Sequence, residues 1–199
     1  MRRRTRVGLL ATAAIVGAYA VGGRRWQLTW GATTEEIERA LPGDELVPRP
    51  TSNATRAISI GVPPERVFPW LVQVGTSRAG WYSYDLLDNL GRPSARRIVP
   101  ELQHLAPGDN VPMSPDGSQG IGVDSVDAPG SMVWYALGET SWAWQLDERE
   151  SGTTRLVTRI RSRPRPTPMS LAFAALVEVG DIWMIRKMLL NLRTRAEAG

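Results

Sequence analysis

Five short strand patterns lie close together between residues 109 and 162, and this spacing constrains the fold more than any other feature of the chain. The expected strands span residues 109–113, 120–126, 131–137, 140–148 and 153–162. Turn clusters rich in Pro, Gly, Asp and Ser separate them. Connections this short join antiparallel neighbours, so we expect an antiparallel meander.

Alternation along the last two strands predicts a sheet with one apolar face and one polar face. The apolar side chains are Trp142, Trp144 and Leu146 in one strand, and Leu156 and Ile160 in the next. The arginines at positions 155, 159 and 161 take the opposite face, which we expect to be solvated.

The longest helical pattern follows the strands, over residues 169–195. It is apolar, but Glu178 and Asp181 are three residues apart and therefore share one side of the helix. This predicts an amphipathic helix rather than a second membrane span, and we expect it to lie across the apolar face of the sheet.

A strand and two short helices precede the meander. Residues 54–62 alternate as a half-buried strand, and Pro64 with Glu65 favours a helix start directly after it. A second short helix is expected over residues 82–90, with Leu86, Leu87 and Leu90 pointing inward. The order of elements therefore predicts an α+β fold: a curved antiparallel sheet wrapped around a long C-terminal helix, with two short helices after the first strand.

This order resembles the helix-grip fold of the SRPBCC superfamily, which includes START and polyketide-cyclase-like proteins. Local sequences are similar to those of a bacterial, membrane-anchored subgroup of that superfamily, over roughly residues 55–195. They are VPPERVFPWLVQVG, RAGWYSYDLLDNLG, IVPELQHLAPGD, TSWAWQLDE and TTRLVTRIRS. Members of the superfamily include lipid and sterol carriers, hormone receptors, allergens, aromatase/cyclases and stress-response modulators, so the resemblance implies a fold more firmly than an activity.

The resemblance implies a pocket between the sheet and the long helix, open near the short helices. The candidate ligand-binding residues are Trp70, Trp81, Tyr82, Tyr84, Asp85, Asn89, Trp142, Trp144, Leu156, Ile160, Met184 and Met188. Aromatic walls with a few polar groups are typical of a small-molecule site, and methionines adapt to differently shaped guests. Two alternatives stay open: the tryptophans fill a solid core, and Asp85 and Asn89 only cap a helix.

The residue inventory restricts the chemistry. Cysteine is absent and His104 is the only histidine, so we expect no thiol chemistry, no metal site and no cofactor. No glycine-rich phosphate-binding pattern precedes a helix. Asp85 and Glu101 are the weak candidates for a catalytic acid or base, although either can equally hold a loop in place.

The N-terminus has a pattern typical of a membrane or targeting segment. Residues 7–23 form an uncharged run of 17 residues flanked by arginines, which is at the lower limit for crossing a bilayer. Three interpretations compete: an uncleaved signal anchor, a signal peptide with the small-residue pattern Ala18-Tyr19-Ala20, and an amphipathic or packed helix. Trp26 and Trp30 suit a membrane interface and favour the anchor.

We therefore expect a cell-membrane protein with one N-terminal span. More arginines precede the run than follow it, which favours an extracytoplasmic domain. The chain divides into an anchor (1–25), a connecting arm (26–53) and a helix-grip domain (54–199). The anchor holds six of the 24 basic residues and none of the 20 acidic ones, so the rest is mildly acidic and no nucleic-acid partner is expected.

Three functions remain open at this stage. The first is binding or carriage of a small hydrophobic ligand, such as a lipid, an isoprenoid or an aromatic molecule, near the membrane. The second is a cyclase-, dehydratase- or hydrolase-like enzyme that uses a pocket carboxylate. The third is an interaction module with a solid core and no ligand.

Overall fold

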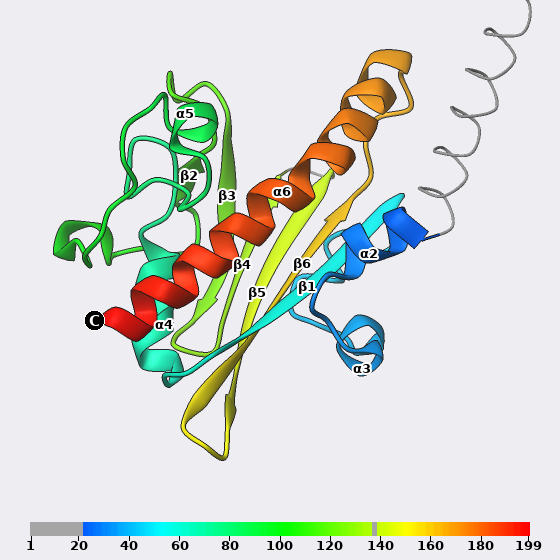
Figure 1. The fold of residues 1–199 in the computed structure, drawn as a ribbon. Coiled ribbons are helices and arrows are strands. Elements are labelled where there is room, and N and C mark those ends of the chain that lie inside the picture. The colour runs from blue at the N-terminus through cyan, green and yellow to red at the C-terminus, as the bar shows by residue number, and fades with distance from the viewer. Residues whose placement is uncertain (1–21, 137–138) are drawn as a thin grey trace, which may run out of the picture.

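A six-stranded antiparallel sheet with one long helix across it forms the centre of the molecule (Figure 1). The computed structural model describes residues 22–136 and 139–199. The strands are β1 (Ser52–Ile60), β2 (Asn110–Pro112), β3 (Gly120–Asp127), β4 (Ser131–Ala136), β5 (Thr140–Arg149) and β6 (Thr153–Ser162), in the order β1-β6-β5-β4-β3-β2. The helices are α2 (Arg24–Thr29), α3 (Thr34–Glu38), α4 (Pro64–Val72), α5 (Asp85–Asp88) and α6 (Pro168–Ala198), with a 3-10 turn, η2 (Pro100–Leu102).

This arrangement confirms the predicted α+β, helix-grip class. Each strand expected from the sequence is present, with ends that differ by two residues or fewer. Every strand pair is antiparallel: short connections join β2 to β6 in sequence, and β1 extends the sheet by pairing with β6. The expected N-terminal span lies outside the described residues.

The inner face of the sheet carries a cluster of tryptophans. Trp134 on β4 pairs with Trp142 on β5, and Met132 pairs with Trp144, so these large side chains share one face. The ring centroids of Trp142 and Trp144 are 4.9 Å apart, and those of Trp134 and Trp142 are 5.3 Å apart. The indoles therefore fill the centre of the space between sheet and helix.

The second half of α6 closes this core. Its buried side chains recur every three or four residues, as expected for one face of a helix. They are Ile182, Ile185, Met188, Leu189, Leu192 and Ala196. Complete burial of an aliphatic side chain of this size contributes about 1.5–3 kcal/mol, so this stripe fixes the helix on the sheet.

The opposite face of the sheet differs from the prediction, because the connecting arm covers it. Arg159, expected in solvent, is 2% exposed. Its guanidinium donates to Thr55 Oγ1 at 2.9 Å, to three backbone carbonyls within residues 36–39 at 2.8 and 2.9 Å, and to Asp44 at 2.6 Å. Arg155 binds Glu36 at 2.7 Å in the same way. The expectation of a solvated face was wrong, since these arginines bind the arm to the sheet.

The second short helix was also predicted incorrectly. Only Asp85–Asp88 is helical, and Leu86, Leu87 and Leu90 are 79%, 71% and 65% exposed rather than inward. The backbone explains the difference, because Tyr82 and Leu90 have φ angles of 57° and 52°. These values lie in the left-handed region, which interrupts a right-handed helix at both ends of the expected segment.

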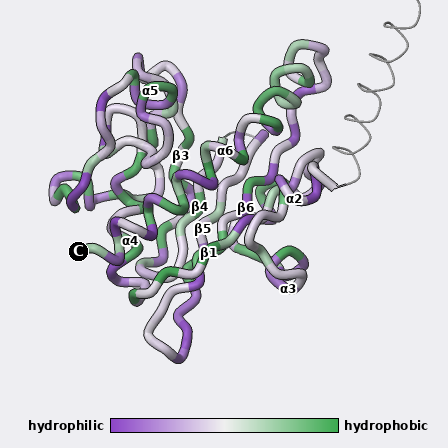
Figure 2. The backbone as a smooth tube through the Cα atoms, in the orientation of Figure 1, coloured by the Kyte–Doolittle hydropathy of each residue, from purple (hydrophilic) through white to green (hydrophobic). Residues whose placement is uncertain are grey.

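The first half of α6 extends beyond the core. Residues 168–181 are mostly exposed although nearly all of them are apolar, and Figure 2 shows the hydrophobic colouring of this end of the helix. The amphipathic pattern predicted for the whole helix therefore holds only for its second half. Within the described part of the chain, α6 is the one helix whose length and composition would allow it to cross a membrane.

Candidate functional site

An open cleft of about 370 Å³ lies between α6 and the loops that carry α5 and follow β2. We call it the mouth cleft, because it lies where the sequence predicted the pocket entrance. Its lining residues are Trp81, Ser83, Leu87, Asp88, Met113, Pro115, Trp142, Val177, Gly180, Asp181, Met184, Ile185 and Met188. The tryptophan cluster fills the deeper space, so the accessible volume is at the edge of the core.

Two stacked indoles form an aromatic part of this lining. Trp81 and Trp142 are parallel, with an interplanar angle of 4° and ring centroids 6.0 Å apart. Trp81 Nε1 donates to Thr76 Oγ1 at 2.9 Å, and Trp142 Nε1 donates to Thr158 Oγ1 at 2.8 Å. Both rings are thus held in place by buried hydrogen bonds, which gives the cleft a preformed aromatic surface.

Ser83 and Asp88 bring buried polar atoms with poor hydrogen bonding to the cleft. The Ser83 hydroxyl and both carboxylate oxygens of Asp88 are buried, and none makes a hydrogen bond of good geometry among the described residues. Burial raises the pKa of Asp88, and the nearby Asp85 raises it further. The Ser83 hydroxyl and the backbone N–H groups of Tyr84 and Asp88 offset only part of this rise. A donor group on a ligand would complete these bonds.

Asp181 is the second carboxylate of the lining, and it is already paired. Its Oδ2 accepts a hydrogen bond from Arg56 Nη1 at 2.6 Å, and the Arg56 side chain is 1% exposed. Burial raises the pKa of Asp181, while the Arg56 guanidinium works against this rise. The pair links α6 to β1, so Asp181 contributes negative charge to the cleft but is less available to a ligand than Asp88.

Four of the predicted ligand-binding residues lie together in the mouth cleft: Trp81, Trp142, Met184 and Met188. Trp144 and Leu156 are fully buried in the core, and Ile160 packs at its edge. The Tyr84 ring lies 3.8 Å from Lys187 Nζ and is partly exposed.

The predicted polar residues Asp85 and Asn89 hold the loop together. Asp85 accepts a hydrogen bond from Ser94 Oγ at 2.5 Å. Asn89 Nδ2 donates to the Arg92 carbonyl at 2.8 Å, and Asn89 is buried. Neither residue is part of the cleft lining.

Tyr82 is a structural junction rather than a residue of the entrance. Its hydroxyl donates to the Trp70 carbonyl at 3.1 Å and accepts from Gln73 Nε2 at 2.8 Å. Its own carbonyl accepts from Asn191 Nδ2 of α6 at 2.7 Å. Burial raises the pKa of Tyr82 to about 12. Tyr82 therefore joins α4, α6 and the loop that carries the cleft residues Trp81 and Ser83.

None of the residues considered for catalysis lines the cleft. Glu101 is exposed on η2 and His104 is exposed nearby, while Asp85 accepts a hydrogen bond from Ser94. Among residues 22–136 and 139–199, no group of three or more His, Asp or Glu side chains is arranged to hold a metal ion. The cleft chemistry thus rests on Ser83, Asp88 and Asp181.

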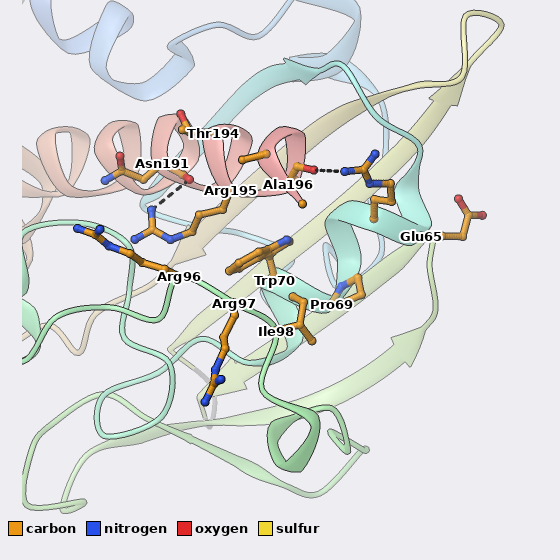
Figure 3. A pocket seen from close by; sticks show the side chains of 13 residues that line it. Glu65, Pro69, Trp70, Arg96, Arg97, Ile98, Asn191, Thr194, Arg195 and Ala196 are labelled. Atoms are coloured by element: carbon orange, nitrogen blue, oxygen red, sulfur yellow. Dashed lines mark hydrogen bonds between the residues drawn. The ribbon is translucent and has the colours of Figure 1, made fainter.

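A larger hollow of about 730 Å³ lies at the other end of α6, next to α4 (Figure 3). Trp70 belongs to this arginine hollow, together with Arg66, Arg96, Arg97 and Arg195. Arg66 Nη2 donates to the Ala196 carbonyl at 3.2 Å, and Arg195 Nε donates to the Ala95 carbonyl at 2.9 Å. Cations at the C-terminal end of a helix stabilise its dipole, so this hollow secures the end of α6.

Most of the cleft residues that sequence reasoning missed come from loops and from α6. They include Ser83, Asp88, Met113, Gly180 and Ile185. The one available signal was the position of Asp181, together with Glu178, in an otherwise apolar segment of the long helix, which indicated a partner or a polar surface. The loop residues gave no signal, because their positions depend on the left-handed turns around α5.

No protein-family model matches this sequence, and no curated protein matches it either. Solved structures with a similar arrangement include protein BH1534 from Bacillus halodurans, at 17% identity and a TM-score of 0.48, where the match covers 74% of this chain and 99% of the other. The Aha1 dimer from Colwellia psychrerythraea is similar at 17% identity and a TM-score of 0.45, over 75% of this chain and 98% of the other. Protein NE0264 from Nitrosomonas europaea gives 16% identity and a TM-score of 0.46, over 73% and 94%.

Proposed function

We propose that this protein binds a small apolar molecule with a hydrogen-bond donor at one end, and holds it in the mouth cleft beside a membrane. The observation that carries the proposal is the pairing of an unfilled apolar space with the Ser83 and Asp88 oxygens, which make no hydrogen bond of good geometry within the described part of the chain. Neither feature alone would distinguish a binding site from a packing defect. Together they provide a place for an apolar body and a polar end.

The size of the cleft supports a small ligand. Binding pockets for small molecules have volumes of about 300–1,000 Å³, and the mouth cleft lies near the lower limit at about 370 Å³. Its apolar wall combines the Trp81–Trp142 stack with Met184 and Met188. Flexible thioether side chains accommodate different shapes, which suits a single aliphatic chain or a small isoprenoid or aromatic body.

The charge of the cleft selects the polar end of the ligand. A buried acceptor without a partner costs about 1–3 kcal/mol, and a bound hydroxyl or amine would recover much of this by donating to Asp88. A ligand carboxylate would instead meet the carboxylates of Asp88 and Asp181. Alcohols and amines are therefore favoured over fatty acids.

Catalysis by Asp88 is the second candidate. Its raised pKa is a property of general acids and bases, and it lies in the cleft. However, the remaining ionisable group of the lining is Asp181, which is paired with Arg56. Binding is the better-supported function, since the cleft lining, within the described residues, holds no His, Lys or Arg that would activate the Ser83 hydroxyl or stabilise an oxyanion.

A series of ten-carbon probes tests the proposal. The full chain in phosphatidylcholine nanodiscs is titrated with decan-1-ol, decylamine and decanoate, and tryptophan fluorescence reports occupancy because Trp81 and Trp142 line the cleft. We expect saturable binding of the alcohol and the amine, and binding of decanoate weaker by at least tenfold. Asp88→Asn should remove most of the preference for the amine over the acid.

Two outcomes would overturn the proposal. In one, none of the three probes gives a saturable signal and native mass spectrometry of the purified chain detects no bound small molecule. In the other, decanoate binds as tightly as decylamine in both the original chain and the Asp88→Asn variant. A nanodisc without protein measures partition of each probe into lipid, and this is subtracted.

A further inference from the structure

The first half of α6 exposes a continuous apolar surface. Seven large apolar side chains between residues 169 and 183 are exposed: Met169, Leu171, Phe173, Leu176, Val177, Val179 and Trp183. Glu178 is the one charged residue between positions 169 and 180, and it binds Arg24 at 2.8 Å and Ser52 at 2.7 Å. A helix at a 1.5 Å rise per residue gives this surface a length of about 21 Å. Soluble monomers rarely expose apolar surface so continuously.

The opposite side of the mouth cleft is apolar as well. Leu86, Leu87 and Leu90 project from the α5 loop, and Met113 is exposed after β2. Leu87 and Met113 line the cleft from this side, while Val177 lines it from α6. Figure 1 shows α5 and the first half of α6 at the same end of the molecule, opposite the β5–β6 turn. We call the exposed leucines, Met113 and the seven side chains of α6 the apolar rim.

The N-terminal chain leads to this rim. Residues 7–23 are the uncharged run, and α2, which follows it directly, lies against α6. Arg24 pairs with Glu178, and the Trp26 and Trp183 rings are 6.3 Å apart. The residues that directly follow the uncharged run therefore lie against the apolar rim.

Cations flank the apolar part of α6 at both ends. Arg163 and Arg165 precede the helix, and Arg186 and Lys187 follow its exposed half. The Arg186 guanidinium lies 5.4 Å from the Trp30 ring centroid, and Lys187 Nζ lies 3.8 Å from that of Tyr84. Paired cations and aromatic rings at the border of an apolar surface are typical of the headgroup region of a membrane.

We propose that the apolar rim lies in the surface of the lipid bilayer that holds residues 7–23, so that the mouth cleft opens into the acyl chains. A helix in this position places its apolar side about 5–10 Å below the headgroups and its cations among the phosphates. Three features favour a bilayer over a protein partner: the uncharged run at residues 7–23, the flanking cations, and the pairing of Glu178 with Arg24. Docking in this way also goes beyond ligand binding, since it requires no occupant in the cleft.

The absence of cysteine allows a direct test on the full chain. Single variants Leu176→Cys and Leu86→Cys carry a nitrobenzoxadiazole probe on each side of the cleft, and Ser151→Cys places the same probe in the exposed β5–β6 turn as a matched control. Each protein is reconstituted in phosphatidylcholine–phosphatidylglycerol vesicles, with or without nitroxide-labelled lipid. All three positions are exposed, so the labels should leave thermal unfolding unchanged.

We expect nitroxide lipid to reduce emission at positions 176 and 86 at least twofold, with a blue shift, and to leave the Ser151→Cys probe unchanged. Equal, water-like emission at all three positions would overturn the proposal. A disulfide between two Leu176→Cys chains that forms equally in detergent and in vesicles would assign the rim to a second copy of the chain. If the probe at position 176 is shielded from both nitroxide lipid and aqueous iodide, residues 7–23 would be the segment that covers the rim.

This experiment is independent of the proposed ligand. The probes are measured without alcohol or amine, so a chain that fails to bind decan-1-ol still gives a clear result for membrane contact. Conversely, a chain with a water-exposed rim is still able to bind the ten-carbon probes.

Discussion

Replacement of Gly180 by leucine separates stability from ligand binding. Gly180 is a helical residue of α6 in the lining of the mouth cleft, and a Cβ atom added there would meet no atom within 4 Å. Glycine within a helix costs about 1 kcal/mol relative to good helix formers. The variant should therefore unfold about 2–4 °C higher, as that free energy implies for a chain of this size.

The leucine side chain introduced at position 180 should also displace ligand from the cleft. If leucine takes the place of two or three methylene groups of bound decan-1-ol, the loss is about 1.6–2.4 kcal/mol, or roughly 15- to 60-fold in Kd. Tryptophan fluorescence titration and thermal unfolding in the same nanodiscs measure the two effects. Val179→Leu is the control, because Val179 is exposed and does not line the cleft.

The reasoning would be refuted by a Gly180→Leu chain that melts higher but binds decan-1-ol as the original chain does, because the ligand would then lie elsewhere. A lower melting temperature would show that the space beside Gly180 is not open. An equal loss of affinity in Val179→Leu would point to an effect on the helix surface rather than on the cleft.

Three further outcomes follow from buried charges. The folded-state pKa of Asp88 is raised above its usual value of 3.8, so the protonated carboxyl favours the folded state and this stabilisation is lost as pH rises through the folded-state pKa. The charged carboxylate at pH 7 therefore destabilises the fold. Asp88→Asn should raise the urea midpoint at pH 7, and raise it less at pH 4. Arg159→Met removes all the hydrogen bonds between this guanidinium and the arm. It should lower the free energy of unfolding by about 3–5 kcal/mol and expose residues 39–50 to protease. An unchanged urea midpoint and an unchanged cleavage pattern would contradict the role of Arg159 in binding the arm. Asp181→Asn leaves Arg56 buried without its charge partner, with a similar loss, and adding Arg56→Met should recover much of it, as urea unfolding of both variants would show.

The strands and the long helix were predictable because each has a local signal. Alternation placed Trp142 and Trp144 on one face, and the three-to-four spacing of apolar residues placed Met188 and Leu192 toward the sheet. Turn clusters fixed the strand ends. These features depend on periodicity, which a single sequence contains.

The outer face of the sheet could not be predicted in this way. Arg155 and Arg159 alternate as solvated residues do, and nothing local distinguishes a free arginine from one that binds a distant segment. Their partners Glu36 and Asp44 lie more than 100 residues earlier in the chain. Long-range ion pairs leave no periodic pattern, so the arm looked like a linker.

The candidate site was predictable only in its apolar half. Trp81, Trp142, Met184 and Met188 were expected from the resemblance and from the faces of their elements, and they do lie together. Ser83 and Asp88 were missed because the loop follows left-handed turns at Tyr82 and Leu90 instead of the expected helix. The same turns point three leucines outward, which a helical pattern assigns to the core.

Because the arm is bound to the sheet, the domain has little freedom to move away from the segment that precedes it. The Ala57 N–H donates to the Trp30 carbonyl, and Glu36 and Asp44 form ion pairs with arginines of β6. The segment between α2 and β1 is therefore bound along the sheet and does not act as a flexible linker. If residues 7–23 cross the bilayer as proposed, the domain is unable to swing across an aqueous gap to a second membrane. Such a protein works as a stationary receptor, and any donor or acceptor of its ligand must come to it.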